Sequence, residues 1–304
     1  MAKRLVCVFG GTGFLGRQVV RHLAESGCRV RVVARTPDQT AFAGVDDALL
    51  EFCAADLRDD SAVEKALAGA QGAVDAVSLY VERRGFTFED IHARSADRLA
   101  RSSRSGGLDA FAYVSGIGAD ADSESALVRA KAVGERLVAA SFPGAYIVRP
   151  SVMFGRDDAF LSNLKMATRL PVVPLFGAGD VRMQPAWVDD VAQAIARLVG
   201  QAQTGEGGER VFEFGGAQTL SYREAVAAVC AELDRRRLLL PVPLGVWKVL
   251  ARAMGVLPNP PLTIDQIYLL AKDNTVNPSR DGFAQLGMQP AGMRDLLGRC
   301  LARG

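Results

Sequence analysis

The stretch LVCVFGGTGFLG, from Leu5 to Gly16, decides the fold of this chain. A short apolar run typical of a buried strand leads into a glycine-rich turn, and a helical pattern over Gln18–Ser26 follows directly. Glycine at Gly10 and Gly13 suits a tight turn whose backbone approaches a pyrophosphate closely, and Gly16 lets the helix pack against the strand. The helix N-terminus then directs unpaired N–H groups and the positive end of its dipole at the phosphates.

This turn is predicted to bind a dinucleotide, in preference to serving as a purely structural turn. An isolated glycine pattern carries little information, but here the strand, the turn and the helix follow one another in register. The predicted contacts with the nucleotide in this loop are Gly10, Thr12, Gly13, Phe14, Leu15 and Gly16.

Beyond the loop, strand-like runs alternate with helical patterns. The expected strands are Leu5–Phe9, Arg29–Ala34, Leu49–Phe52, Ala73–Ser78, Ala110–Val114 and Ala145–Val148, and the expected helices include Ser61–Ala68 and Phe88–Ser102. Apolar strands joined by crossover helices predict an α/β fold, a Rossmann-type doubly wound parallel sheet that binds ligands beyond the carboxyl ends of its strands. The alternation fades near residue 155. We expect residues 1–155 to form the nucleotide-binding domain and residues 156–304 a smaller, mostly helical domain, with part of 183–215 returning to the first.

Composition narrows the class of protein. Of 304 residues, 36 are Lys or Arg and 34 are Asp or Glu, so the net charge of +2 argues against a nucleic-acid partner. The five cysteines are odd in number and widely spaced, which favours reduced core residues in a reducing compartment over a disulfide or metal framework. No metal site is expected. An apolar strand follows Met1 almost at once and no apolar run reaches about 18 residues, so we expect neither a signal peptide nor a membrane span, and a cytoplasmic or peripheral location.

The ends of the next strands suggest which nucleotide binds. Arg35 follows the second strand, where a site selective for NAD usually has an acidic residue, and a guanidinium there suits the 2′-phosphate of NADP(H). Arg31 or Lys3 are possible helpers, and a solvated arginine at a strand end is the alternative. Asp56, followed by Leu57, is placed to accept a hydrogen bond from the adenine amino group or to cap the helix that begins near Ser61. Ser78, at the end of the fourth predicted strand, is a further predicted contact.

At this point the chain resembles the extended and atypical short-chain dehydrogenases. The resemblance rests on the glycine loop, on Tyr113-Val114-Ser115, on Lys131 within Arg129–Glu135, and on the segment Arg149–Gly155, from which Pro150 and Val152 are further predicted cofactor contacts. In that family a Ser or Thr, a Tyr and a Lys four residues later form the catalytic set, with the Tyr transferring the proton and the Lys holding the nicotinamide ribose.

The resemblance implies cofactor contacts at Ser115 and Lys131, but the tyrosine is missing. Leu127 stands four residues before Lys131, and an aliphatic side chain has no proton to transfer. Tyr113 ends the preceding strand and is expected in the core. His92 stands where the wider family often has an Asn. It could relay a proton, although a hydrogen-bonded structural histidine is the favoured interpretation.

One branch of the family is more similar still. Phe88–His92, Ser141-Phe142-Pro143, Phe154–Asp158, Gln184-Pro185, Val188–Val191, Pro261–Gln266 and Asp273-Asn274 resemble, in order and spacing, the nucleotide-binding accessory subunit of respiratory complex I and its bacterial relatives. That resemblance implies a tightly held NADPH that stabilises the subunit and need not turn over. It also implies other complex I subunits as partners and a peripheral place on the cytoplasmic side of the bacterial inner membrane, or on the matrix side if mitochondrial.

Three functions remain open from the sequence. The preferred one is a non-catalytic NADPH-binding subunit of complex I, whose apolar segment 238–257 docks against a partner or a membrane surface. A helix packing over the core of its own domain is the alternative for that segment. The second function is an active NADP-dependent oxidoreductase acting on a quinone-like or isoprenoid substrate through Ser115, Lys131 and His92. The third is a regulator that reads the NADP(H) ratio through a partner.

Overall fold

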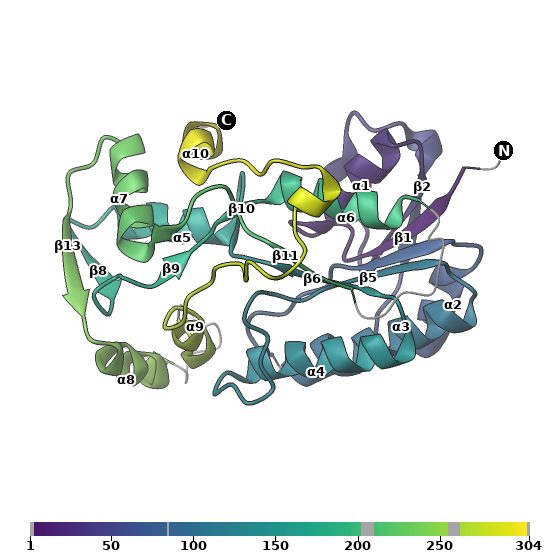
Figure 1. Ribbon diagram of the computed structural model, residues 1–304, viewed down its shortest axis with the longest axis horizontal. Coiled ribbons are helices and arrows are strands. Elements are labelled where there is room, and N and C mark those ends of the chain that lie inside the picture. The colour runs from purple at the N-terminus through teal and green to yellow at the C-terminus, as the bar shows by residue number, and fades with distance from the viewer. Residues whose placement is uncertain (1–2, 84, 202–209, 255–261, 303–304) are drawn as a thin grey trace.

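A parallel sheet of seven strands forms the centre of the first lobe in the computed structural model, which describes residues 3–83, 85–201, 210–254 and 262–302. The strand order is β11-β6-β5-β4-β1-β2-β3 (Figure 1). The strands are β1 (Leu5–Phe9), β2 (Arg29–Ala34), β3 (Leu50–Ala54), β4 (Gly72–Asp75), β5 (Ala110–Val114), β6 (Tyr146–Pro150) and β11 (Arg210–Phe214). Their parallel register, with Val8 opposite both Val32 and Val74, requires a crossover connection between neighbours.

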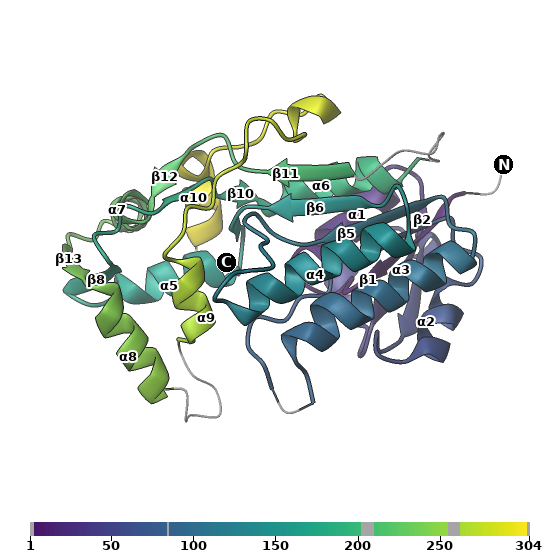
Figure 2. The same ribbon diagram turned by 60° about the horizontal axis from the view of Figure 1, so that its bottom comes forward.

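Helices cover both faces of this sheet, which explains why its strands are apolar on both sides. On one face lie α1 (Gly16–Glu25) and α6 (Val188–Val199). On the other lie α2 (Asp60–Leu67), α3 (Ala96–Ser105) and α4 (Ala126–Ser141), as Figure 2 shows. Side chains of β1 alternate between the two layers, because Val6 and Val8 belong to the core under α1 and α6 while Cys7 and Phe9 belong to the other core. The predicted α/β doubly wound fold is confirmed.

A second lobe follows β6 and contains more strand than we expected. Its helices are α5 (Ala159–Ala167), α7 (Tyr222–Glu232), α8 (Leu244–Met254), α9 (Ile264–Leu269) and α10 (Met293–Leu301). Its strands are β7 (Met153–Phe154), β8 (Val172–Phe176), β9 (Arg182–Met183), β10 (Ala186–Trp187), β12 (Leu220–Ser221) and β13 (Leu238–Val242), paired as β10-β7, β12-β9 and β13-β8. A separate core that includes Phe154, Leu175, Val226 and Met293 holds the lobe together.

The chain returns from the second lobe to the first at two places. Helix α6 packs on α1, and β11 extends the main sheet beside β6. Residues 202–209 of the predicted returning stretch lie outside the described residues. The boundary between the two domains at residue 155 stays a prediction. The carboxyl ends of the parallel strands face the second lobe (Figure 2), which places the expected ligand site between the lobes.

Several element boundaries differ from the prediction by one or two residues, and two larger differences bear on the site. Strand β4 ends at Asp75, so Ser78 lies in the following loop and not in a strand. The helix expected over Phe88–Ser102 is built of a π-helical turn, Asp90–Ser95, that continues into α3. Among the described residues, no helix is both long and apolar enough to cross a lipid bilayer.

Candidate nucleotide-binding site

The loop between β1 and α1 has a geometry that only glycine permits. Gly10 has a φ of 75°, in the left-handed region, and a Cβ there would lie 2.9 Å from the carbonyl carbon and oxygen of Ala76. At Gly16 a Cβ would collide with the carbonyl oxygen of Gly10. The first turn of α1 therefore lies directly on the end of β1 because both positions lack a side chain.

The same loop presents free donors. The Gly13 N–H is bonded to the Gly10 carbonyl (2.9 Å), but the N–H groups of Thr12, Phe14, Leu15 and Gly16 have no acceptor within the described parts of the chain. Gly13 itself is exposed. Four unpaired N–H groups at the positive end of a helix dipole form a site for an anion such as a pyrophosphate. The residues present thus fit the phosphates of a dinucleotide.

Two arginines and a phenylalanine lie at the ends of β2 and β3. The Arg35 guanidinium carbon lies 4.9 Å from the ring centroid of Phe86, and that of Arg58 lies 3.9 Å from the same ring. Arg58 also binds Asp56 through Nε (3.0 Å) and Nη2 (2.7 Å), and these hydrogen bonds lower the pKa of the Asp56 carboxyl. The aromatic ring and the cations are suited to surround an adenosine phosphate.

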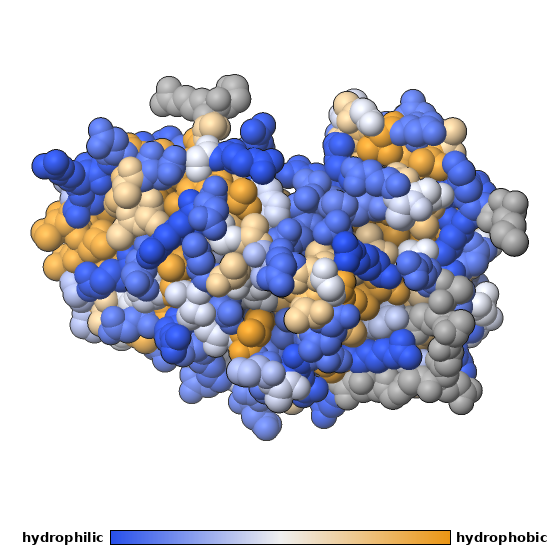
Figure 3. Space-filling view, turned by 45° about the horizontal axis from the view of Figure 1, so that its top comes forward, coloured by the Kyte–Doolittle hydropathy of each residue, from blue (hydrophilic) through white to orange (hydrophobic). Residues whose placement is uncertain are grey.

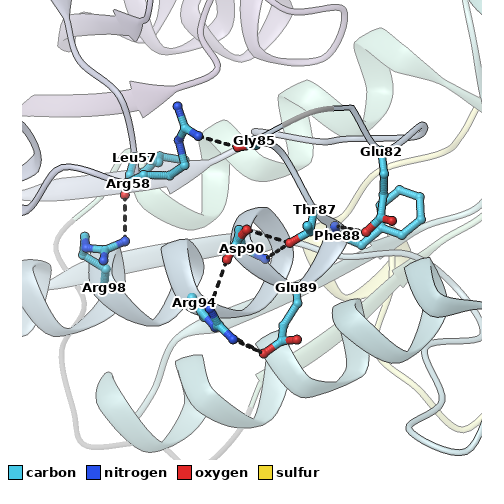
Figure 4. Close-up of polar contacts among 10 residues, drawn as sticks. All are labelled: Leu57, Arg58, Glu82, Gly85, Thr87, Phe88, Glu89, Asp90, Arg94 and Arg98. Atoms are coloured by element: carbon cyan, nitrogen blue, oxygen red, sulfur yellow. Dashed lines mark hydrogen bonds and ion pairs between the residues drawn. The ribbon is translucent and has the colours of Figure 1, made fainter. Parts of the chain in front are cut away.

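Four residues predicted to act at this end of the site were Asp56, Arg31, Leu57 and Lys3. The helix at Ser61 is capped by Asp59, whose carboxylate accepts the Ser61 N–H at 3.0 Å, so the capping alternative for Asp56 is wrong. Arg31 was a possible helper, but its guanidinium is bound by Glu51 (2.8 Å) and by the carbonyl oxygens of Ala66 and Ala68. Leu57 is buried, and its carbonyl oxygen accepts a hydrogen bond from Arg98 (3.2 Å; Figure 4). Lys3 is exposed.

A segment after β4, residues 76–83 and 85–89 and hereafter the crossing loop, joins the two ends of the site. Its middle is fixed by Arg58, which donates to the Gly85 carbonyl at 2.6 Å (Figure 4). Its end is fixed by Glu82, which accepts the Phe88 N–H at 2.8 Å, and by Thr87, which donates to Asp90 at 2.7 Å. The exposed Ser78 lies near its start. The crossing loop thus extends along the carboxyl edge of the sheet from Lys131 to Arg58.

The other end of the site contains the Ser and Lys of the family pattern. Lys131 on α4 donates to the Ser115 carbonyl at 2.9 Å, and its Nζ lies 5.7 Å from the ring centroid of Tyr80 on the crossing loop. The Ser115 hydroxyl is buried and has no partner among the described residues. A buried hydroxyl without a partner at the predicted nicotinamide end is a second feature that fits a bound nucleotide.

Leu127 is a packing residue. Its side chain is 2% exposed and forms a small apolar cluster with Phe88 and Ala130, against which Leu79 and Ala126 also pack. Two of these partners, Leu79 and Phe88, belong to the crossing loop. The position that carries a phenol in the family therefore holds this loop in place instead.

Tyr113 and His92 lie in the interior behind the site. Tyr113 is buried and donates to the His92 carbonyl at 2.8 Å, so it belongs to the core, and burial raises the pKa of its phenol well above the usual value. His92 is fully buried, with Nε2 3.2 Å from the Leu79 nitrogen and 3.0 Å from the Leu79 oxygen. Burial, together with the Lys131 ammonium, lowers the pKa of His92 to about 3, so the imidazole is neutral at physiological pH. His92 fixes the residue next to Tyr80.

Two further predicted contacts lie at the end of β6. Pro150 is buried and its carbonyl oxygen accepts the Ile117 N–H at 3.1 Å. The Val152 N–H is already bonded to the Asn274 side chain at 2.7 Å, so only the side chain of Val152 remains for a ligand. Both residues lie at the carboxyl edge of the sheet.

Sequence reasoning missed Asp75. This carboxyl ends β4 beside the glycine loop, is 2% exposed, and accepts the Val77 N–H at 3.1 Å. Burial raises its pKa to about 7. An acidic residue inside an otherwise apolar strand was the signal that could have found it.

The segment 238–257 was predicted either to dock on a partner or membrane surface or to pack over the core of its own domain. The structure agrees with each interpretation in part. The Trp247 indole donates to the Leu175 carbonyl at 3.0 Å, so α8 packs on its own lobe. Leu238 and Val249, however, are 64% and 63% exposed, and Figure 3 shows apolar side chains at the end of the molecule that carries β13. Residues 255–257 of the segment lie outside the described residues.

The amino-acid sequence of this chain is similar to those of known proteins. The profile of the NAD dependent epimerase/dehydratase family matches residues 6–212. The chain is 31% identical over 288 residues to the "NADH dehydrogenase [ubiquinone] 1 alpha subcomplex subunit 9, mitochondrial" of Rattus norvegicus, covering 93% of this chain and 76% of that one. It is 32% identical over 204 residues to the "Ceramide reductase" of Caulobacter vibrioides, covering 67% of this chain and 62% of that one.

A solved structure has the same fold. The NADPH-dependent quinone oxidoreductase of Escherichia coli, complexed with NADPH, superposes with a TM-score of 0.75 at 19% identity, covering 98% of this chain and 100% of that one.

Proposed function

Since this chain belongs to the NAD dependent epimerase/dehydratase family, we propose that it is an NADP(H)-binding accessory subunit of respiratory complex I, or of its bacterial counterpart, in which the nucleotide stabilises the fold. The identity to a protein named as a complex I subunit extends over 93% of the chain and supports the partner. The free N–H groups of the glycine loop and the unpartnered Ser115 hydroxyl support the nucleotide.

The observation that carries the structural role is the burial of Leu127. A nicotinamide dinucleotide supplies hydride transfer when bound, but the family reaction also requires a proton donor four residues before Lys131. This chain places there a side chain that is 2% exposed and packed against Phe88. The substitution removes the proton and adds an apolar contact that holds the crossing loop. In this proposal the chain still binds the nucleotide but lacks the proton donor that the family reaction requires.

NADP(H) is proposed over NAD(H) because of Arg35. Its guanidinium is exposed at the end of β2, stacks on Phe86, and forms no hydrogen bond or ion pair with the described residues. Asp56 at the end of β3 is already bound by Arg58. A free guanidinium beside an occupied carboxylate favours a 2′-phosphate over an unmodified ribose.

A nucleotide held in this way contributes to stability by mass action. A ligand that binds only the folded state adds RT ln(1 + [L]/Kd), which is about 4 kcal/mol at a thousandfold excess over Kd. The loops at the ends of β1, β2, β4 and β5 all take part in the site. Ordering them together is therefore a sufficient role for the nucleotide.

We further propose that the exposed apolar side chains of β13 and α8 dock the subunit on the complex, close to the membrane surface. Leu238, Leu240, Val246, Val249 and Leu250 are all at least 44% exposed, although α8 is anchored to its own lobe. The corresponding proposed location is peripheral, on the cytoplasmic side of the bacterial inner membrane or on the matrix side if the protein is mitochondrial.

Purification from detergent-solubilised membranes tests the proposal. A tagged chain should co-purify with complex I subunits and one NADPH per chain. A Leu238→Ser, Val249→Ser variant should keep the nucleotide but lose the subunits, whereas Leu137→Ser, which changes an exposed leucine on α4 of the first lobe, should keep both. An intact chain free of complex I subunits and of nucleotide would contradict the proposal.

One observation favours a second function, an oxidoreductase acting on a quinone-like or isoprenoid substrate. The Tyr80 ring lies beside the Lys131 ammonium, so a phenol from the crossing loop occupies the neighbourhood that Leu127 leaves without one. The identity to a protein named as a ceramide reductase points in the same direction. Oxidation of NADPH by the purified chain in the presence of a water-soluble quinone, abolished by Tyr80→Phe, would support this function. Absence of turnover in the parent chain would exclude it for that substrate class.

A further inference from the structure

A hollow lies between the two lobes, apart from the predicted nucleotide site. It has a volume of about 490 Å³ and is bounded by α1 on one side and by α10 and the residues after β7 on the other. Figure 3 shows a notch between the lobes on this side of the molecule. Its lining includes Arg17, Arg21, Arg156, Arg299 and Trp187. None of the residues predicted to contact the dinucleotide lines it.

The hollow has an excess of positive charge. Arg17, Arg156 and Arg299 form no ion pair with any described carboxylate. The hollow also contains Asp157 and Asp189, but Asp189 is already bound by the His22 imidazole at 3.0 Å. The His22 hydrogen bond and, to a smaller extent, the charge of Arg299 lower the pKa of the Asp189 carboxyl, so Arg299 does have an acidic neighbour. Four arginines against two aspartates still leave the lining with a net positive charge, which a bound anion would offset.

The turn that carries Arg156 is rigid and strained. Asp157 has a φ of 62°, which is rare for a residue other than glycine. The turn is fixed on both sides of Arg156, because the buried Asp158 carboxylate accepts the Gly155 N–H at 2.9 Å and the Leu161 N–H at 2.7 Å. Gly155 is packed so closely on Phe14 and Val188 that a Cβ would lie 2.8 Å from the Val188 side chain. Strain held in place by such contacts is characteristic of functional positions.

We propose that this hollow binds a phosphate group carried by a small molecule or a lipid headgroup, held by Arg17, Arg156 and Arg299. The planar guanidinium fork matches the geometry of phosphate oxygens, and three of them suit a group with more than one negative charge. The volume lies within the range of about 300 to 1,000 Å³ typical of small-molecule sites. The Trp187 ring supplies a flat wall for the part of the ligand that carries the phosphate. Because the walls belong to both lobes, the occupant bridges them.

The site is tested by titrating the full chain with inorganic pyrophosphate in the presence of saturating NADPH, which keeps the probe out of the glycine loop. Isothermal titration calorimetry should detect one site per chain. Arg156→Gln, Arg299→Gln should weaken it about tenfold or more, since each change removes a charge-assisted contact. Arg104→Gln is the matched control, because Arg104 is exposed on α3 and far from this lining. Unchanged stoichiometric NADPH binding shows that the variants are folded.

Vesicles distinguish the two sources of phosphate. Co-sedimentation with phosphatidic acid vesicles, lost in the double variant and absent with phosphatidylcholine, assigns the site to a lipid headgroup. Pyrophosphate binding without co-sedimentation assigns it to a soluble phosphate. The proposal is overturned if pyrophosphate does not bind beside NADPH, or if it binds equally to the double variant and to Arg104→Gln. Neither result depends on whether NADPH turns over.

Discussion

Replacing Asp75 with Asn should make the protein more stable at neutral and alkaline pH. Asp75 is a fully buried carboxyl whose pKa burial raises from 3.8 to about 7, and its recorded hydrogen-bond partner is the Val77 N–H. Asn keeps the oxygen that accepts this bond and cannot ionise. The perturbation therefore removes a titration while leaving the volume of the side chain almost unchanged.

The size of the effect follows from the two pKa values of Asp75. A carboxyl group whose pKa is raised on folding stabilises the folded state fully below 3.8, and this contribution is lost as the pH rises through 7. At 1.36 kcal/mol for each pH unit, the whole difference is about 4 kcal/mol, of which about 2.5 kcal/mol falls between about pH 5 and about pH 8. The unpaired amide N–H₂ of Asn lowers the free energy of unfolding by an amount that does not depend on pH. It therefore does not affect how the difference between variant and parent changes with pH.

Urea denaturation of the parent chain and of Asp75→Asn across this pH range measures the effect. The variant's free energy of unfolding should rise relative to the parent's by about 2.5 kcal/mol from the acidic to the alkaline end. All other titrating groups are common to both proteins and drop out of the difference. A difference that stays constant with pH, or that changes in the opposite direction, would refute the assignment of a buried neutral carboxyl to Asp75.

The same variant reports on the nucleotide. Ala76, the residue after Asp75, lies against Gly10, so phosphates bound at the glycine loop favour the protonated form of Asp75. Near pH 7 the parent chain should therefore take up as much as about half a proton on binding NADPH. Calorimetry in buffers of different ionisation enthalpy should show this uptake in the parent chain and its absence in Asp75→Asn.

The remaining predictions concern the contacts of the nucleotide. Arg35→Gln should weaken NADPH binding about 10- to 100-fold and leave NADH binding unchanged, as measured by calorimetry; equal losses for both nucleotides would contradict the role of Arg35. Leu127→Ala should cost about 2 to 3 kcal/mol in denaturation and accelerate NADPH release, while Leu127→Met should be nearly neutral; normal release from the Ala variant would show that the crossing loop does not retain the nucleotide. Gly10→Ala should abolish NADPH binding, whereas Gly27→Ala, with a φ of 85° and open space around it, should bind NADPH normally; equal losses would implicate backbone strain alone.

Local signals explain what the sequence predicted correctly. The glycine loop, the strand-like runs and the helical periods of the first lobe depend on nearest neighbours, so the doubly wound sheet could be derived from them. The proximity of Ser115 and Lys131 followed from the resemblance to a family and agrees with their contact at 2.9 Å. The packing of Leu127 was not derivable, because its partner Phe88 is distant in the sequence.

Long-range contacts explain what the sequence did not reveal. The path of the crossing loop depends on Arg58 reaching Gly85 and on His92 reaching Leu79, and neither pairing has a periodic signature. The pairing of β8 with β13 likewise joins segments separated by two helices, so the small sheets of the second lobe were not foreseen in a domain predicted to be mostly helical. Asp59 was overlooked as a helix cap because Asp56 is an equally good cap by residue type.

The near-ultraviolet absorbance of the chain, purified without added nucleotide and then mixed with a soluble quinone, tests the central claim most directly. A structural nucleotide should appear as one reduced nicotinamide per folded chain, and its absorbance should persist after the quinone is added and disappear only on unfolding. A chain purified without nucleotide, or an absorbance that decays on addition of the quinone while the fold remains intact, would contradict the claim that the site holds NADPH to stabilise the protein.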